Sequence, residues 1–521
     1  MSPKKKLNFK NYLPVGLLGL FSFYVNYYYG FIGVNPMDNF VLYNGGYKVL
    51  NGYIPFTDYW LVTGPLLDYL NAFFFLINGV SWKSYIIHSS LFNLTISIAT
   101  YILFINLGLK NLFSFFYSFL FSILFYPGVG TPFVDHHATF FLIFGFYFFV
   151  LGLNKNNQFY FISIPFLFCL SFLSKQTPTA YGMISMCPLI LTYLFFKKKK
   201  AKKILLSLSF GTGISIIFLF LFFHFTKINF INFYDQYILF AKTIGNYRIS
   251  NYNFNLVNII AKYKFLSVLI FFLIIILIKL YKKNNKNIEA IFTILSAITL
   301  GAVLIFHQYL TLNENYIFFL IPLLTGIIHI YYKNIFINKL FLYVLIFFCI
   351  YGTIKYHIRF NEHRKFIDLE NVDLSKAIDA EILTKDLKGL RWITKKYQKK
   401  PEDEINNLIK IMEIIAKDKS NKALITEYQF LAPTLKIYDF SPNQWHHPGV
   451  SFPIENQRYY KKYQDFFIKN LKKNNIDLIY ETVSGDESIT ELVISKKCLL
   501  KQRLTEMLIK FEIQKNCKEF K

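Results

Sequence analysis

The run VLIFFLIIILI at residues 268–278 contains no polar side chain, so a helix formed there is apolar on every face. The stretch YLPVGLLGLFSFYVNYYYGFIGV at residues 12–34 is almost as apolar. A run of about 20 such residues spans the hydrocarbon core of a bilayer. The composition agrees, because 54% of the 521 residues are hydrophobic and 20% are aromatic. We therefore expect a polytopic α-helical membrane protein.

Apolar runs separated by polar breaks continue along the first two thirds of the chain. Lys4, Lys5 and Lys6 precede the first run, as in a signal peptide. That run is too long for a signal-peptide core and lacks a small-residue cleavage site, so we expect a retained span. The pattern predicts about eleven transmembrane helices, at residues 13–31, 84–106, 111–127, 137–153, 158–174, 178–196, 204–226, 265–281, 288–306, 315–332 and 336–354.

The distribution of lysines predicts the orientation of these helices, because cytoplasmic loops retain Lys and Arg. With the N-terminus in the cytoplasm, the cytoplasmic breaks include KKKKAKK at 197–203 and KLYKKNNK at 279–286. The alternate breaks PGVGTPFVDH at 127–136 and HQYLTLNEN at 307–315 contain no basic residue. Eleven spans then place the C-terminus outside. The net charge of +26 is scattered between apolar segments, so we expect no nucleic-acid partner.

Carboxylates gather on the predicted outer side. Residues 1–354 contain seven acidic residues, of which only Glu289 falls inside. A bias against Lys and Arg outside does not by itself gather carboxylates there, so we expect a working face on that side. The plainer alternative is that loops are where a few acids are tolerated. The six outer acids are Asp38, Asp58, Asp68, Asp135, Asp235 and Glu314.

Two outer segments, 32–83 and 227–263, are too long to be simple turns. Within the first, DNFVLYNGGYKVL at 38–50 has the spacing of a short helix in the membrane interface. We assign these loops to a transmembrane domain that covers residues 1–354. The more polar residues 355–521 are expected to form a soluble α/β or α+β domain on the outer side.

The periodicity of apolar residues predicts secondary-structure elements within this soluble domain. EDEINNLIKIMEIIAK at 402–417 predicts a helix, and KALITEY at 422–428, IDLIYETV at 476–483 and ITELVISKK at 489–497 predict strands. Cys498 and Cys517 can pair only if the domain faces an oxidising compartment, and their spacing does not demand it.

The loop after the first predicted span begins GVNPMDNFVLYNGG at residues 33–46, which places Asp38 at the outer surface. A carboxylate held close to a hydroxyl and partly desolvated can act as a general base. An Asp just past a helix end is also typical of a cap or turn. The residues that follow, YNGGYKVLNGYIPFTDYW at 43–60 and TGPLLDYLNAFFFLINGVSW at 63–82, resemble the first external loop of the GT-C superfamily of integral-membrane glycosyltransferases. The likeness rests, in order, on Gly45, Gly46, Gly52, Pro55, Asp58, Gly64, Pro65 and Tyr69.

The resemblance covers about residues 1–330 and is to the bacterial branch related to protein O-mannosyltransferases and lipid A aminoarabinose transferases. The family carries another acid in its second external loop, here Asp135 in TPFVDHHATFF at 131–141. Its lysine motif resembles LSKQTPTAYG at 173–182, which contains Lys175, and its late motif resembles NYIFFLIPLL at 315–324. Asn39 and Asn315 depart from the family pattern, because many relatives have a second acid at the first position and an Arg at the other.

This resemblance implies a GT-C-like fold and a glycosyltransferase that moves a hexosyl or pentosyl group from a polyprenyl-phosphate-linked donor. The acceptor is a glycan, lipid or protein on the outer face, in a bacterial inner membrane. We expect Asp38 to be the general base and Asp135 an orienting or second acid. Lys175 and Arg248 are expected to contact the donor phosphate, since an anionic headgroup needs a cation at the interface.

Other side chains are expected to line the site. Asp135, His136 and His137 offer ligands for a divalent ion, but adjacent ligands seldom converge on one metal, so we expect no metal site and no required cofactor. His446 and His447, in SPNQWHHPGVSFP at 441–453, are interpreted as an acceptor contact or a plain surface loop. The expected lining residues are Asp58, Tyr59, His136, His137 and His307.

Two other functions stay open from the sequence. An O-antigen ligase or polymerase also works on lipid-linked glycans, although its large external loop usually comes late in the chain, whereas here the richest loop comes first. A transporter or flippase of lipid-linked glycans would place charges within its spans and repeat its halves. Neither feature is evident, and no phosphate-binding Gly loop, dinucleotide fingerprint or zinc-ligand spacing is present.

Overall fold

The computed structural model describes residues 12–251, 254–282, 287–311, 316–332, 339–438, 440–482, 488–514 and 517. Residues 4–6, 314 and 315, used above, lie outside these ranges. The chain divides into two compact units, each built from three separate segments. The first unit contains Met1–Gly30, Ile86–Leu219 and Asn251–Phe366, and the second contains Phe31–Tyr85, Phe220–Ser250 and Ile367–Lys521.

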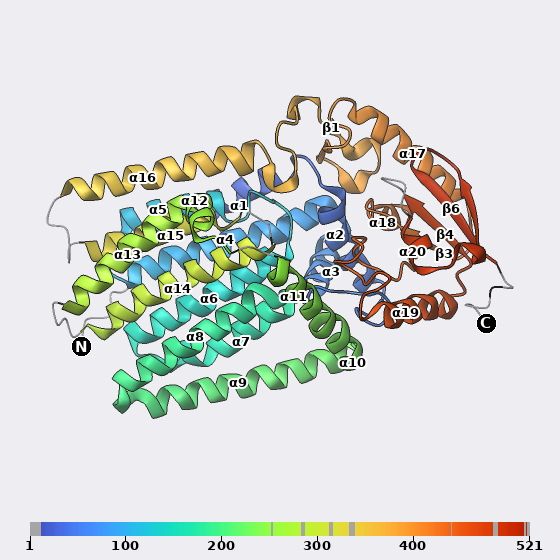
Figure 1. The fold of residues 1–521 in the computed structure, drawn as a ribbon. Coiled ribbons are helices and arrows are strands. Elements are labelled where there is room, and N and C mark those ends of the chain that lie inside the picture. The colour runs from blue at the N-terminus through green and yellow to red at the C-terminus, as the bar shows by residue number, and fades with distance from the viewer. Residues whose placement is uncertain are drawn as a thin grey trace. The chain divides into compact units, whose positions relative to one another are not determined.

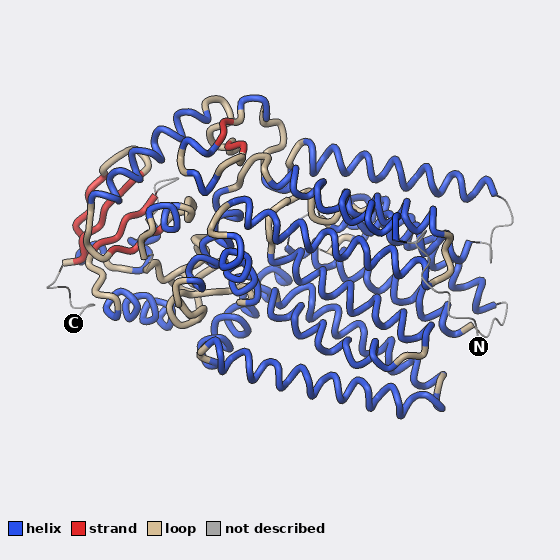
Figure 2. Tube along the Cα trace, turned by 180° about the vertical axis from the view of Figure 1, so that it is seen from behind, coloured by secondary structure: helices blue, strands red, loops and turns tan. Residues whose placement is uncertain are grey.

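The first unit is made of helices, most of them long and apolar, that lie side by side (Figure 1 and Figure 2). They are α1 (Tyr12–Gly30), α4 (Trp82–Asn106), α5 (Asn111–Leu124), α6 (Val134–Lys155), α7 (Gln158–Ser174), α8 (Gln176–Phe196), α9 (Lys198–Thr226), α12 (Leu256–Lys262), α13 (Lys264–Lys282), α14 (Ile288–Thr311), α15 (Leu320–Tyr331) and α16 (Lys339–His357). A short helical turn at Ile317–Phe319 precedes α15, and two more, at Ile358–Glu362 and Lys365–Ile367, follow α16.

Seven helices are long and apolar enough to cross a membrane, which makes the chain a multi-pass membrane protein by length and composition. They are Trp82–Asn106, Val134–Lys155, Gln176–Phe196, Lys198–Thr226, Lys264–Lys282, Ile288–Thr311 and Lys339–Ile367. Each of the eleven predicted spans overlaps a helix, but α1, α5, α7 and α15 are not among these seven. Eleven crossings and their orientation therefore stay predictions.

Helix α6 lies in the interior of the first unit. In its apolar window 83% of the residues are buried inside the protein, compared with 22% in α9. It contacts α7, α8 and α14. Any polar side chain at the start of α6 is therefore surrounded by other helices and needs partners from them.

The second unit combines helices with two small sheets. Its helices are α2 (Pro36–Leu50), α3 (Leu66–Asn78), α10 (Phe230–Phe233), α11 (Ala241–Asn251), α17 (Pro401–Lys417), α18 (Leu431–Leu435), α19 (Tyr460–Lys473) and α20 (Ile489–Val493), with a π-helical segment at Tyr234–Phe240 and short turns at Leu374–Lys376, Ala380–Ile382, Lys385–Leu387 and Lys496–Cys498. Its strands are β1 (Ile378–Asp379), β2 (Arg391–Trp392), β3 (Lys422–Ile425), β4 (Leu478–Thr482), β5 (Leu499–Arg503) and β6 (Leu508–Ile513).

The larger sheet has the strand order β3-β4-β6-β5, and β1 pairs with β2 separately. Strands β3 and β4 are parallel, with Lys422 opposite Leu478, whereas the other pairs are antiparallel. The parallel pair needs a crossover, and the chain between β3 and β4 supplies it with α18 and α19.

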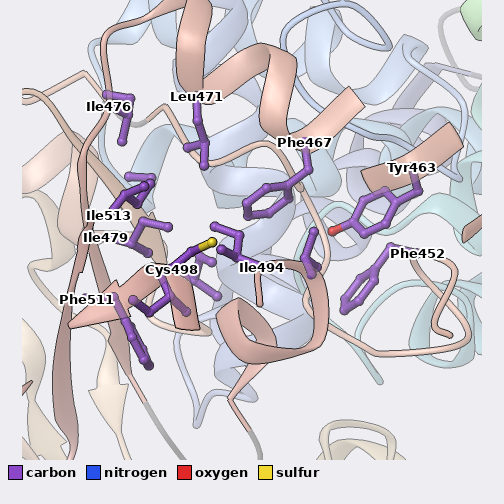
Figure 3. Close-up of a cluster of buried hydrophobic side chains, with 14 of the residues drawn as sticks. Phe452, Tyr463, Phe467, Leu471, Ile476, Ile479, Ile494, Cys498, Phe511 and Ile513 are labelled. Carbon is purple, nitrogen blue, oxygen red and sulfur yellow. The ribbon is translucent and has the colours of Figure 1, made fainter. Parts of the chain in front are cut away.

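One buried apolar cluster holds this sheet and α19 together. Tyr463, Phe467 and Leu471 recur every four residues along α19 and are fully buried. They share the cluster with Ile479 of β4 and Phe511 of β6 (Figure 3). The spacing of four residues places the three side chains on one face of the helix, which explains why this highly charged segment folds.

The predicted elements of the soluble region are confirmed at three positions. The helix predicted at 402–417 is α17, which begins at Pro401 and has acids in its first turn, both favourable at a helix start. The strands predicted at 422–428 and 476–483 contain β3 and β4.

The strand predicted at 489–497 is wrong, because this segment forms α20 followed by a short turn. The Ser488 hydroxyl accepts the Glu491 N–H at 3.3 Å, and the Glu481 carboxylate accepts the Ile489 N–H at 2.6 Å. These acceptors satisfy donors of the first helical turn and favour a helix over a strand.

Cys498 and Cys517 form a disulfide, with their Cα atoms 5.2 Å apart. Cys498 immediately precedes β5, so the bond ties residue 517 back to the sheet. The sequence had left this pairing open. Closing a loop of this length stabilises a fold by about 3 kcal/mol.

The division into units differs from the predicted boundary at residue 354. Residues of both predicted external loops, 31–85 and 220–250, group with 367–521, and the first unit extends to Phe366. Side-chain contacts described below connect these distant segments within the second unit.

Candidate active site

Asp135 lies in the first turn of α6, directly after the loop that leads out of α5. A carboxylate is favourable there because the free N–H groups of a helix start carry partial positive charge. The side chain is only 1% exposed. A charge buried to this degree requires a partner of opposite charge.

Lys175 supplies that partner from the break between α7 and α8. Its backbone is extended, with φ −158° and ψ 143°, which ends α7 and starts α8. Its Nζ donates to both oxygens of Asp135, at 2.8 Å to Oδ1 and 2.6 Å to Oδ2. The side chain of Lys175 is 18% exposed, so Lys175 is the more accessible member of the pair.

His307, near the end of α14, completes the cluster. Its Nε2 lies 2.8 Å from Asp135 Oδ1, and its side chain is fully buried. Helix α6, helix α14 and the break between α7 and α8 thus bring together three residues that are far apart in the sequence. Two groups hold the carboxylate, and the carboxylate in turn fixes the position of the Lys175 ammonium, which can contact an anion such as a phosphate.

Aromatic rings surround the next residue of α6, His136. The ring is fully buried, with its centroid 4.5 Å from that of Tyr316 and 4.9 Å from that of Tyr126. The Tyr316 hydroxyl lies 3.2 Å from Thr139 Oγ1, one turn farther along α6. His136 thus packs beside the charged cluster, inside an aromatic cage.

His137 takes a different direction. Its Nδ1 is hydrogen-bonded to the Tyr126 hydroxyl, and its Nε2 lies 3.0 Å from His88 Nε2. This pairing belongs to the packing of α4 against α6. Among the described residues, no group of three His, Cys, Asp or Glu side chains is arranged to hold a metal ion.

Asp38 belongs to the second unit, where it lies in the first turn of α2 and is half-buried. Asn35 Nδ2 donates to Asp38 Oδ2 at 3.1 Å. Pro36 starts the helix, since its fixed φ suits the first helical position. The chain therefore presents this carboxylate at a helix start, with a hydrogen-bond donor beside it.

Asn39 has a structural role in place of the second acid of the family. It is buried, and its Oδ1 accepts the Asn35 N–H at 2.8 Å. The Tyr85 hydroxyl donates to the Asn39 carbonyl oxygen at 3.0 Å. An amide oxygen serves this capping position without adding a second charge beside Asp38.

Asp58 and Tyr59, both expected to line the site, hold the first loop within the second unit. Asp58 Oδ2 accepts the Ile54 N–H at 2.8 Å, and Asp58 Oδ1 pairs with Lys473 of α19 at 2.8 Å. The Tyr59 hydroxyl donates to Asp68 Oδ2 at 2.8 Å. These contacts account in structural terms for Tyr59 and for Asp58, which belongs to the pattern that the sequence shares with the GT-C superfamily.

Asp68 is the centre of a buried polar network that the sequence did not reveal. Gln444 Nε2 donates to its two oxygens at 2.9 and 3.1 Å. Burial raises the pKa of the Asp68 carboxyl to about 7, although the hydrogen bonds from Tyr59 and Gln444 and the charge of Lys48 act in the opposite direction. No spacing in the sequence connects residues 68 and 444.

The glycine pair of the family pattern lets α2 pack closely against α3. A Cβ on Gly45 would lie 2.2 Å from Asp68 Oδ1, and a Cβ on Gly46 would lie 2.5 Å from the Cβ of Asn71. No real side chain fits at those distances. The pair is therefore required by packing, independently of any catalytic role.

Arg248 lies in the last turn of α11 and is half-buried. Burial and the nearby Arg248 charge lower the pKa of His447 below its usual range. Arg248 and His447 are thus close neighbours in the second unit, while His446 is buried.

The structure thus joins Asp135, Lys175 and His307 in one cluster of the first unit. Asp38, Asp58, Tyr59 and Arg248 belong to the second unit. The sequence identifies Asp68 only as an outer acid and gives it no role. His88, Tyr126, Thr139 and Gln444 are not singled out from the sequence.

No protein-family model and no curated protein sequence matches this chain. A crystal structure of the Archaeoglobus fulgidus oligosaccharyltransferase in complex with Zn and sulfate is similar to it, with TM-score 0.44 and 12% identity over 90% of this chain and 68% of that chain. The same enzyme tethered to an acceptor peptide containing the NVT sequon by a disulfide bond gives TM-score 0.44 and 13% identity over 91% and 69%. Neither belongs to the bacterial branch that the sequence resembles, and similarity at this level does not establish a shared fold or function.

Proposed function

We propose that the chain is a membrane glycosyltransferase of the GT-C type that transfers a sugar from a polyprenyl-phosphate donor to an acceptor on the outer face of the membrane. The observation that carries the proposal is the buried cluster of Asp135, Lys175 and His307. The first-loop pattern around Asp38 resembles that superfamily and supports the same assignment.

Lys175 is assigned to the donor phosphate. The Lys175 ammonium donates two hydrogen bonds to Asp135, which leaves its third N–H for an anionic oxygen of the donor. His307 of α14 contacts the same carboxylate and helps to hold Asp135 in place. Arg248 is proposed as a second phosphate contact.

Asp38 is assigned as the general base. The acceptor hydroxyl oxygen forms a bond to the anomeric carbon while the bond from that carbon to the phosphate oxygen breaks. The electron pair of the broken bond leaves with the phosphate, and the hydroxyl proton passes to Asp38. The phosphate leaves as a stable anion that needs no acid, so one base and one phosphate clamp suffice, and the sugar carbon is inverted.

The Cys498–Cys517 disulfide supports an extracytoplasmic position for residues 367–521. Disulfides persist in oxidising compartments and are rare in the cytosol. A reporter fused after Lys521 tests this orientation, and a cytoplasmic signal would contradict it.

The test is a transfer assay in membranes that contain the full chain. Undecaprenyl-phosphate hexoses and pentoses with a labelled sugar are supplied, and the label is counted in the glycan, lipid and protein fractions. We expect Asp38→Asn to reduce transfer by about 10²–10⁴-fold, the contribution of a general base. Lys175→Met is expected to reduce it by about 10²–10³-fold, as for the loss of one charge-stabilising donor.

Glu289→Gln is the matched control, because Glu289 pairs with Lys197 at the other end of α14 from His307. It is expected to leave transfer unchanged. Normal transfer by well-expressed Asp38→Asn would show that the base is misassigned. Flux of labelled donor across proteoliposomes with no acceptor and no transfer would favour a flippase instead.

A further inference from the structure

Six of the seven residues at 197–203 are lysines, at the turn between α8 and α9 (Figure 1). Helix α8 ends at Phe196, and α9 begins at Lys198. Both helices are among the seven that are long and apolar enough to cross a membrane. A turn that joins two such helices lies at the level of the lipid headgroups, so this dense positive charge meets the membrane surface.

Little of this charge is compensated within the protein. Lys197 Nζ pairs with the Glu289 carboxylate of α14 at 2.8 Å. Four further lysines of the turn are exposed and form no ion pair with any described residue. They are Lys198, Lys199, Lys202 and Lys203, which together form the lysine patch. Four ammonium groups thus remain for anions from outside the described chain.

The stability of α9 does not explain the lysine patch. The free N–H groups of a helix start carry partial positive charge, so acids are favourable in the first turn and lysines are not. The first turn of α9 contains lysines and no acid, whereas that of α17 contains Glu402, Asp403 and Glu404. An anion bound from outside the chain would offset this repulsion.

The predicted membrane orientation does not require so many lysines either. The breaks at 107–110 and 154–157 are assigned to the same side of the membrane, and each contains one lysine. Six lysines within seven residues exceed that number several-fold. The lysine patch therefore needs a reason besides orientation, and anion binding supplies one.

Exposed apolar side chains flank the lysine patch on both sides. Phe195 and Phe196 precede it, and Leu205 and Leu206 follow it. Lys198 Nζ lies 5.3 Å from the centroid of the Phe195 ring. A lysine stem packs along apolar side chains in this way while its ammonium reaches the polar headgroups. Apolar groups next to cations fit a lipid surface better than they fit a dissolved anion.

We propose that the lysine patch binds anionic phospholipids, whose headgroup phosphates pair with its ammonium groups. A zwitterionic headgroup carries its own cation, which repels the lysines, so the patch distinguishes the two classes of lipid. Lys175 lies at the other end of α8, about 30 Å away along a helix of 21 residues. The lysine patch is therefore separate from the proposed donor-phosphate site, and lipid binding there does not depend on transferase activity.

Binding is tested with the purified full chain in dodecyl maltoside, by the fluorescence anisotropy of labelled phosphatidylglycerol and of labelled phosphatidylcholine, its zwitterionic counterpart. We expect phosphatidylglycerol to bind at least about tenfold more tightly, because each lysine near an anionic surface contributes about fivefold. Replacing the four lysines together, by Lys198→Gln, Lys199→Gln, Lys202→Gln and Lys203→Gln, is expected to abolish this preference. Substitution of the same four lysines by arginine is expected to preserve it. Raising the salt from about 0.1 M to about 1 M is expected to abolish it in the wild type.

A second lysine cluster provides the matched control. Four exposed lysines of the second unit precede the acidic first turn of α17; they are Lys395, Lys396, Lys399 and Lys400. Their replacement by glutamine is expected to leave the preference for phosphatidylglycerol unchanged. Thermal melts establish that each variant is folded. If the glutamine variant of the lysine patch is not folded, the arginine variant and the salt series on the wild type decide.

Equal binding of the two lipids by the wild type would overturn the proposal, as would a preference that persists in the glutamine variant or at about 1 M salt. An equal loss in the control cluster would show that total charge, and not the lysine patch, determines binding. Displacement of the labelled lipid by an equal concentration of glycerol 3-phosphate would indicate a site for a soluble anion and would also overturn it.

Discussion

Replacing Asp68 by asparagine is expected to remove a pH-dependent cost of folding from the second unit. The buried carboxyl has a folded-state pKa of about 7, against an ordinary value of 3.8. An asparagine has nearly the same shape and can still accept from Tyr59, but it cannot ionise. The pH dependence of stability that belongs to this one group is therefore lost in Asp68→Asn.

The sign follows from proton binding. Between about pH 4 and pH 7 the folded chain keeps a proton on Asp68 that the unfolded chain has released, so stability falls as the pH rises through this window and levels off above it. The difference between 3.8 and about 7, at about 1.4 kcal/mol per pKa unit, amounts to about 4 kcal/mol.

The assay is urea unfolding in detergent, followed by tryptophan fluorescence at a series of pH values. The four tryptophans, Trp60, Trp82, Trp392 and Trp445, all belong to the second unit and provide the signal. The wild-type free energy of unfolding minus that of Asp68→Asn is expected to fall by about 4 kcal/mol from pH 4 to pH 8. Parallel profiles, within about 1 kcal/mol over the whole range, would refute the raised pKa of Asp68.

Three shorter predictions concern other contacts. Gly45→Ala places a methyl group 2.2 Å from a neighbouring carboxylate oxygen and is expected to lower the free energy of unfolding by about 1–3 kcal/mol. The control Gly245→Ala, where a Cβ meets nothing within 4 Å, is not expected to lower it. Equal stabilities of the two variants in urea would contradict this prediction. Replacing Cys498 and Cys517 by serine is expected to lower the free energy of unfolding by about 3 kcal/mol, and a reductant should then affect the wild type only. His307→Gln is expected to slow sugar transfer about tenfold, since the Asp135 carboxylate loses one partner; an unchanged initial rate would remove the residue from the site.

The apolar pattern of the sequence predicts the helices of this chain well, and the polar contacts poorly. Runs such as residues 268–278 can only be buried or face lipid, and each predicted span overlaps a helix. Local signals also explain the one wrong strand, because the pair Ser488 and Glu491 is a capping pattern that outweighs the β-branched residues around it. Apolar periodicity and capping patterns involve residues that are close in the sequence, so a single sequence is enough to recognise them.

The sequence predicts which residues belong to the candidate site but not which of them contact one another. The residues Asp135, Lys175 and His307 were named from the sequence, yet nothing in their spacing indicates that the lysine holds the aspartate. The network of Asp68 and Gln444 was missed entirely, because its partners are 376 residues apart. Contacts of that kind depend on how distant segments pack, and a single sequence does not carry this information.

The construction of the second unit from three separate stretches sets the order of its biogenesis. Residues 31–85 leave the ribosome roughly 280 residues before residue 367 does, which at 5–20 residues per second is a delay of about 15–60 s. During that delay Asp68 has no Gln444, and Trp60 lacks the buried apolar cluster of the sheet and α19 against which it later packs. The early loop is thus an incomplete part of its unit until translation ends, and a chain truncated before its last third would expose this loop to proteases and chaperones.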